Sequence, residues 1–155
     1  MASTLGQLDY LSIDGQIMVR YVAPEADIAA FLRRFREAME THGLDLWPTP
    51  KNMKFEDDTN FTKADAELLV RSLRVIDYAT GPEPDDNAAR SSGEVWVFGR
   101  EFEGIDLYLK LKLQFSPHVG GTPSACMSFH PQEYPLKQRH WPQRVGTAPV
   151  GRKTR

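Results

Sequence analysis

Three features are scarce in this sequence: cysteine, long apolar runs and, toward one end of the chain, negative charge. Cys126 is the only cysteine, so no disulfide can form within the chain, and a disulfide-stabilised secreted scaffold is not indicated. No apolar run approaches the roughly 18 residues of a membrane-spanning helix. The first residues also lack the basic and apolar regions of a signal peptide. We therefore expect a cytoplasmic protein that does not enter a membrane.

Negative charge ends well before the chain does. All 21 acidic residues lie at or before Glu133, and the net charge is −2. Basic residues continue beyond that point: Lys137, Arg139, Arg144, Arg152, Lys153 and Arg155. An acidic body with a basic tail is not the usual profile of a nucleic-acid-binding protein. The tail, residues 137–155, is either an electrostatic contact for RNA or a loose chain end.

The composition fits one packed domain, which we place at residues 1–136, because 41% of the 155 residues are hydrophobic and 26% are charged. Near its start, Asp14 and Gly15 form a dipeptide typical of a two-residue β-turn. β-Favouring residues flank this dipeptide. Residues 1–22 are therefore expected to be either a hairpin extension of the domain or a poorly ordered one.

Two helices are predicted in the first half of the chain. The first begins at Pro24, a residue typical of the first helical position, and ends before Gly43. The second begins at Thr62, which forms a variant of the capping box with Asp65. Four of its side chains are expected to face inward: Leu68, Leu69, Ser72 and Leu73.

The second half of the chain has the period of β-strands. Strands are predicted at 94–100, 105–114 and 124–130, joined as an antiparallel meander. Residues 44–61 and 79–93 contain prolines or glycines and are predicted to be loops. Helices followed by strands indicate an α+β fold, with two helices packed on a small antiparallel sheet.

The strand at 105–114 has two chemically different faces. Alternation places Tyr108, Lys110 and Lys112 on one face. The other face carries four leucines, which set the register because they must be buried: Leu107, Leu109, Leu111 and Leu113.

The strand at 124–130 alternates in the same way. Its apolar side is expected to join the leucines: Ala125, Met127 and Phe129. Ser128 and His130 would then lie on the face that carries Tyr108. In the strand at 94–100, Trp96 and Arg100 share one side, and Trp96 is either a stacking surface or a core residue.

Such a face has the groups that cleavage of RNA without a metal ion requires. A base must take the proton of the ribose 2′-hydroxyl, a cation must stabilise the charged phosphorane, and an acid must protonate the leaving 5′-oxygen. His130 can act as base or acid, a lysine can supply the charge, and Tyr108 can contact a phosphate or a base. The same alternation of lysine and leucine is also the ordinary pattern of a solvated sheet face, so both interpretations stay open.

Metal-binding patterns are not evident. Cys126 and His130 would lie about 13 Å apart along a strand, too far for one ion, and Cys126 is expected to be a buried thiol. The other histidines lack the spacing of ligands: His42, His118 and His140. We expect neither a metal nor another cofactor.

Three motifs in order resemble the MqsR family, the messenger-RNA-cleaving toxins of bacterial toxin–antitoxin pairs. They are the segment GEVWVFGR at 93–100, the triplet Tyr108-Leu109-Lys110, and the triplet Ser128-Phe129-His130. The resemblance covers residues 25–135. It implies a RelE-like fold, metal-independent endoribonuclease activity on messenger RNA, and neutralisation by a cognate antitoxin, with the ribosome as a further partner to test.

The resemblance also implies roles for single residues. Tyr108 matches the family's active-site tyrosine, His130 matches its catalytic basic residue, and Lys110 matches a phosphate contact. The family's glutamine after the strand tryptophan is Val97 here, and a family lysine is Ala79 here. Other residues would then contact the substrate: Lys51, Trp96, Arg100, Lys112 and Ser128.

Two functions follow. The chain is an endoribonuclease, as His130 favours, or a non-catalytic module that keeps the toxin fold and binds protein or nucleic acid, as Val97 and Ala79 favour.

Overall fold

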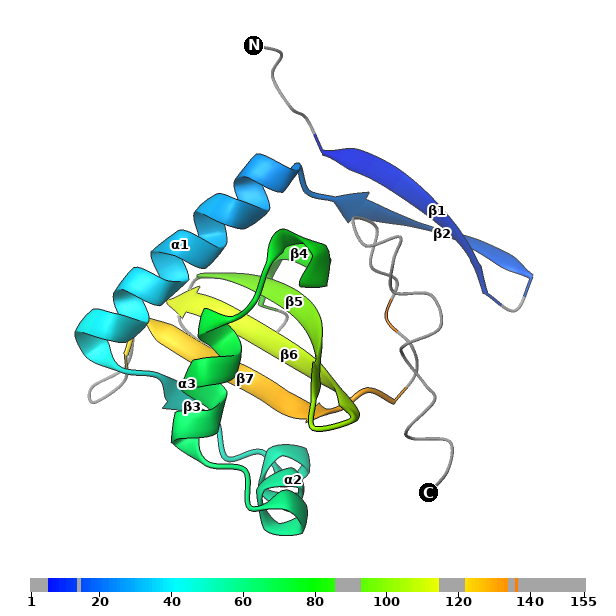
Figure 1. Ribbon diagram of the computed structural model, residues 1–155. Helices are drawn as coiled ribbons and strands as arrows, with labels where there is room; N and C mark the ends of the chain where they lie inside the picture. Colours follow the sequence, from blue (N-terminus) through cyan, green and yellow to red (C-terminus); the bar gives the residue numbers. More distant parts are fainter. Residues whose placement is uncertain (1–5, 14, 86–92, 115–121, 134–135, 137–155) are drawn as a thin grey trace.

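The computed structural model describes residues 6–13, 15–85, 93–114, 122–133 and 136 (Figure 1). The described elements in chain order are β1 (Gln7–Ile13), β2 (Gln16–Val22), α1 (Glu25–His42), β3 (Asp45–Leu46), α2 (Pro50–Thr59), α3 (Lys63–Arg71), the 3-10 helix η1 (Val75–Asp77), β4 (Tyr78–Pro84), β5 (Gly93–Phe102), β6 (Ile105–Gln114) and β7 (Ser124–Pro131). The expected α+β class is confirmed. The tail at 137–155 lies outside the described residues.

The main sheet has five strands in the order β3-β7-β6-β5-β4. The predicted meander of β5, β6 and β7 is confirmed, and each of these neighbours pairs antiparallel. Glu103 and Gly104 join β5 to β6 with φ of 50° and 82°, as a tight hairpin turn requires. β3, which pairs parallel with β7, makes the sheet mixed where an antiparallel one was expected.

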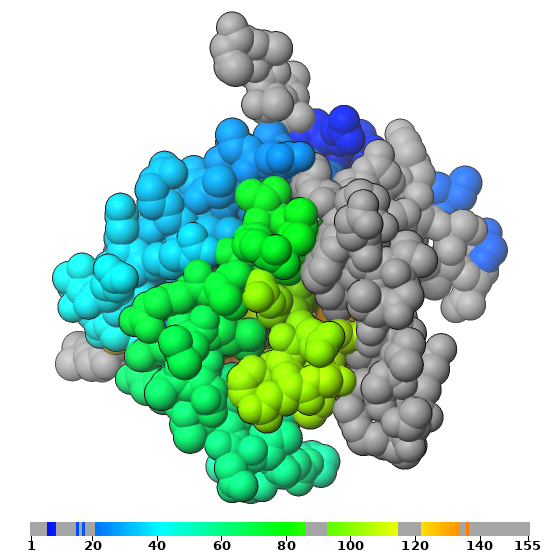
Figure 2. Space-filling model, viewed as in Figure 1, coloured from blue at the N-terminus to red at the C-terminus, as the bar shows by residue number. Residues whose placement is uncertain are grey.

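One face of this sheet packs against the helices. Leu107, Leu109 and Leu111 are at most 1% exposed, as their alternation predicted. They meet apolar side chains of all three helices, among them Phe31 of α1, Phe55 of α2 and others of α3. Burying each such side chain contributes about 1.5–3 kcal/mol to stability. In the space-filling view the helices cover much of this side, and part of the β5–β6 hairpin (yellow-green) shows beside α2 and α3 (Figure 2).

The two predicted helices exist, with one error in the second. α1 ends at His42, and its C-cap is Gly43, whose φ of 86° suits glycine. Pro24 is the N-cap, so α1 begins one position later than expected. The capping box of Thr62 and Asp65 starts α3. Leu68 is 64% exposed, so the expectation that it faces inward is wrong. It lies on the outer side of a helix that buries Leu69.

Both predicted loops contain regular structure. Residues 44–61 contain β3 and α2. The helix α2 forms because Thr49 caps it and Pro50 is its first residue. A proline at that position starts a helix, although in the sequence it suggested a loop. Residues 79–93 were expected to be a loop, but β4 runs as far as Pro84, with register shifts along its pairing with β5. An edge strand tolerates proline because it lacks a neighbour on one side.

The predicted N-terminal hairpin is confirmed as a separate two-stranded sheet of β1 and β2. In Figure 1 it lies beyond the N-terminal end of α1, and β2 contacts β4 at the edge of the five-stranded sheet. Among the described residues, no helix is long and apolar enough to cross a membrane.

Candidate functional site

A β-bulge in β7 decides which of its side chains face the helices. Tyr108 of β6 pairs with His130 and Lys110 pairs with Ser128, but the register then shifts, so that Leu111 pairs with Cys126. Met127 is the additional residue. Because a bulge reverses the alternation beyond it, Phe129 and Cys126 both belong to the core.

The bulge changes the positions expected for Ala125 and Met127 but not those expected for Ser128 and His130. Ala125 was expected to join the leucines, but it pairs with Lys112 on the other face. Met127, also expected in the core, is 4% exposed and is not part of the main core cluster. Ser128 and His130 do share the face of Tyr108 and Lys110, as predicted, because both lie after the bulge.

The side chain of Asn52 attaches α2 to this bulge. Its Nδ2 donates to the Met127 carbonyl at 3.0 Å and to the Trp47 carbonyl at 2.8 Å, and its Oδ1 accepts from the Phe129 amide at 2.9 Å. Asn52 is fully buried, so these bonds form away from water and hold the chain in one position. Lys51, the preceding residue, is thereby placed beside the end of β7.

A groove lies where the start of α2 meets β6 and β7. It consists of two adjoining hollows of about 230 and 210 Å³, and both are lined by Lys51, His130 and Glu133. Tyr108 lines the first and Phe55 the second. We call this feature the His130 groove. It unites three residues that the sequence singled out, Lys51, Tyr108 and His130, from elements far apart in the chain.

The rings of Tyr108 and His130 are stacked, with centroids 5.4 Å apart and planes inclined by 13°. His130 Nδ1 lies 3.0 Å from the Pro131 carbonyl oxygen. A carbonyl oxygen only accepts hydrogen bonds, so Nδ1 carries the proton in this contact. Nε2 is then the nitrogen that can accept or release a proton.

Glu133 lines both hollows of the groove and was not singled out in the sequence. Its Oε2 lies 2.7 Å from Lys51 Nζ, and both side chains are more than half exposed. The hydrogen bond and then the charge of Lys51 lower the pKa of the Glu133 carboxyl, and the charge of His130 adds to this effect. In the sequence, the feature that could have pointed to Glu133 is its position three residues after His130, as the last acidic residue of the chain.

Lys110 and Lys112, predicted to form one row of cations, have different surroundings. Lys112 is fully buried and its Nζ lies 2.8 Å from Asp85 Oδ2, so the expectation that it meets a substrate is wrong. The alternation correctly predicted that Lys112 lies on the face opposite the leucines. At this position, however, that face is buried. Lys110 is half-buried beside Ser128. Neither residue lines the His130 groove.

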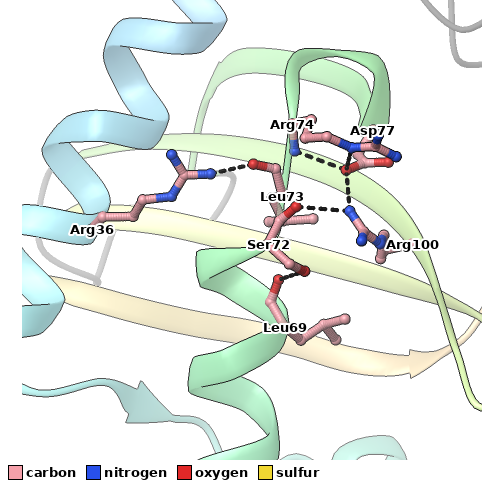
Figure 3. A network of polar contacts seen from close by, with 7 residues as sticks. All are labelled: Arg36, Leu69, Ser72, Leu73, Arg74, Asp77 and Arg100. Atoms are coloured by element: carbon pink, nitrogen blue, oxygen red, sulfur yellow. Dashed lines mark hydrogen bonds and ion pairs between the residues drawn. The ribbon is translucent and has the colours of Figure 1, made fainter.

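Arg100 and Trp96 lie on the helix-facing side of the sheet. Arg100 Nη1 donates to the Ser72 carbonyl at 2.7 Å and to Asp77 Oδ2 at 3.0 Å (Figure 3). Trp96 is 2% exposed and stacks on Phe31 at a centroid distance of 4.6 Å. Both were candidates for substrate contact. In the structure both side chains stabilise the fold instead. Of the two alternatives for Trp96, a stacking surface or a core residue, the structure shows the core residue.

The polar contacts around Asp77 join η1 to β5 and α3 (Figure 3). Asp77 is fully buried and accepts from the Arg74 amide at 2.8 Å. Burial raises the pKa of the Asp77 carboxyl, although Arg74 and Arg100 act in the opposite direction. Arg36 of α1 donates to the Leu73 carbonyl close by. These residues stabilise the junction at which the chain passes from the helices into β4.

Cys126 has neither the exposure nor the ionisation that a nucleophile needs. Its side chain is fully buried, and burial raises the pKa of the thiol to about 12. Within the described part of the chain, no three histidine, cysteine, aspartate or glutamate side chains are grouped as a metal ion would require.

Comparison with known proteins found no matching family model, curated protein or solved structure. The chemistry of the His130 groove is therefore argued from its own geometry.

Proposed function

We propose that the His130 groove binds single-stranded RNA and cleaves it without a metal ion. On this proposal the chain is a messenger-RNA endoribonuclease toxin of a bacterial toxin–antitoxin pair. The observation that carries it is the meeting of Tyr108, His130 and Lys51 in one open groove. These three side chains come from β6, β7 and α2, and they supply an aromatic ring, a proton-transfer group and a cation.

Each groove residue has a step in this reaction. His130 Nε2 exchanges a proton with the substrate, since Nδ1 is bound to the Pro131 carbonyl. Lys51 places its ammonium beside the phosphate, a role that the buried Lys112 cannot take. Tyr108 contacts the phosphate or an adjacent base, and Lys110 on the same strand face extends the positive charge toward the next phosphate.

The arrangement of elements is compatible with a RelE-like toxin, in which helices precede an antiparallel meander. A cognate antitoxin would neutralise the enzyme by covering the His130 groove, and the cytoplasm is where it would meet messenger RNA and ribosomes. The acidic body of the chain opposes the approach of RNA, so association should weaken steeply as salt rises.

A non-catalytic binding module is the second candidate. The observation in its favour is that Glu133 already neutralises Lys51 at 2.7 Å. Val97 and Ala79, which stand where the resembled family has polar side chains, are both buried and offer nothing to a substrate. Such a module would use the groove to hold a ligand without changing it.

Cleavage of a defined messenger RNA by purified protein in EDTA separates the two functions. We expect site-selective cuts by the wild type and a loss of about 10²–10⁴-fold in rate for His130→Ala. Tyr108→Phe should show a smaller loss. His42→Ala is the matched control, because His42 is exposed at the end of α1, outside the groove. A folded wild type that cleaves neither free RNA nor RNA on ribosomes would exclude the nuclease.

A further inference from the structure

Cleavage at a ribose 2′-hydroxyl needs two proton transfers, one from O2′ and one to the leaving O5′. His130 can perform only one of them at a time. Two carboxylates line the groove besides His130, namely Glu133 and Asp58. Glu133 lines both hollows together with His130, whereas Asp58 lines one of them and is paired with Lys54 at 2.9 Å, so Glu133 is the better placed partner. Tyr108 lines only one of the two hollows, and its ring is stacked on His130.

We propose that Glu133 is the base of the reaction and that His130, as the imidazolium, is the acid. This inference rests on the proposed nuclease function. It names a catalytic residue that neither the motifs nor the spacing of the chain suggested. The groove would then hold a complete acid–base pair, with Lys51 between the carboxylate and the substrate phosphate.

The direction of proton transfer follows from the contacts of the two residues. Glu133 Oε2 accepts a hydrogen bond from Lys51 Nζ, and both the bond and the charge favour the carboxylate form. A carboxylate can accept a proton but has none to donate. His130 keeps its Nδ1 proton on the Pro131 carbonyl, so its Nε2 proton is the one available for the leaving oxygen.

The step balances without any further reactant. Glu133 takes the proton from O2′, and O2′ forms a bond to phosphorus. The bond from phosphorus to O5′ breaks, and O5′ takes the Nε2 proton of His130. The products are a 2′,3′-cyclic phosphate and a free 5′-hydroxyl, with Glu133 protonated and His130 neutral. Exchange with water then restores both residues.

Lys51 changes partner during this sequence. In the free protein its ammonium is 2.7 Å from Glu133, and it can turn toward the phosphate because both side chains are exposed. Charge on the phosphate would draw Lys51 away and leave the carboxylate a stronger base when the substrate is in place. Other charged side chains of the groove also act on this balance, namely Lys54 and Asp58, which pair with each other at 2.9 Å.

The dependence of rate on pH gives the first test. Single-turnover cleavage by the wild type should fall at low pH, where Glu133 takes a proton and can no longer act as the base. Glu133→Gln should be slower by about 10²–10⁴-fold and should lack the low-pH limb. Glu40→Gln, an exposed substitution on α1, should match the wild type. Circular dichroism and urea unfolding establish that each variant folds.

A substrate with sulfur in place of the leaving 5′-oxygen distinguishes acid from base. A thiolate leaves without protonation, so this substrate should restore most of the rate of His130→Ala but none of the rate of Glu133→Gln. The opposite pattern, with Glu133→Gln restored, would overturn the assignment. Equal rates for Glu133→Gln and the wild type would also overturn it. A wild type that cleaves neither substrate would overturn the nuclease proposal itself.

Discussion

Asn52 pairs with the backbone of β7 as a neighbouring strand would, donating to the Met127 carbonyl at 3.0 Å while Phe129 donates back to it at 2.9 Å. β3 pairs with β7 only at Ala125 and Cys126. Beyond that point no other strand of the described residues pairs with this edge of β7, and one side chain from α2 bonds to two of its backbone groups. The position of Lys51 in the groove depends on this attachment.

Removal of this amide should weaken both the fold and the groove. Asn52→Ala leaves the Met127 carbonyl and the Phe129 amide without their partner, which we expect to lower the free energy of unfolding by about 2–4 kcal/mol. Urea unfolding measures this change. Met53→Ala is the control, because Met53 is 49% exposed and its loss should cost less than about 0.5 kcal/mol. Equal effects of the two substitutions would show that the amide contacts do not stabilise the fold.

Removing one partner of the buried ion pair of Lys112 and Asp85 should strongly lower the free energy of unfolding. Lys112→Met should lower the free energy of unfolding by about 3–5 kcal/mol, because Asp85 keeps a buried charge without its cation. Lys110→Met, on the same face but half-buried, should cost far less.

A second substitution should recover part of that loss. In Lys112→Met with Asp85→Asn the remaining charge is gone, so the double variant should be more stable than Lys112→Met alone. Urea unfolding of the four proteins gives the coupling energy. Additive losses would mean that the two charges do not interact.

Cys126 should be inert in the folded protein. Its thiol is fully buried and its pKa is raised to about 12, so at pH 8 the thiolate fraction is far below that of a free cysteine. We expect alkylation by iodoacetamide to be at least about a thousandfold slower than in urea-unfolded protein. Mass spectrometry of timed samples measures both rates. Rapid modification of native protein would mean that β7 opens readily.

Asp77 should make stability fall as pH rises. Burial raises the pKa of its carboxyl above the ordinary value of 3.8, so the folded protein binds this proton more tightly than the unfolded chain. Its contribution to the free energy of unfolding is complete below pH 3.8 and is lost as the pH rises through the folded-state pKa.

Asp77→Asn keeps an oxygen acceptor for the Arg74 amide and removes the titration. The free energy of unfolding of the wild type, minus that of the variant, should therefore decrease from acidic pH toward neutrality. Urea unfolding of both proteins at several pH values gives this difference. If it increases with pH, the Arg100 ion pair outweighs the cost of burial, and the direction of the pKa change is wrong.

Local patterns in the sequence predicted most of the elements. The leucines of β6 alternate with polar residues, and that period of two can form only a strand with one buried face. The apolar period of α1 and the capping box of Thr62 are equally local, as is the glycine of the N-terminal turn. Each depends on residues within a few positions of one another, so these elements could be predicted from the sequence alone.

The tertiary structure decided which polar residues meet. The bulge at Met127 reverses the faces of β7, and no local pattern marks it. α2 was missed because its buried side chains, Asn52 and Phe55, make too short an apolar face to be recognised. Lys112 follows the same alternation as Lys110. It differs from Lys110 in being fully buried and paired with Asp85. Lys51 and Glu133 are 82 positions apart in the chain, and they meet because Asn52 attaches α2 to β7. Contacts of that kind arise from packing between distant segments, so the folded chain alone determines them.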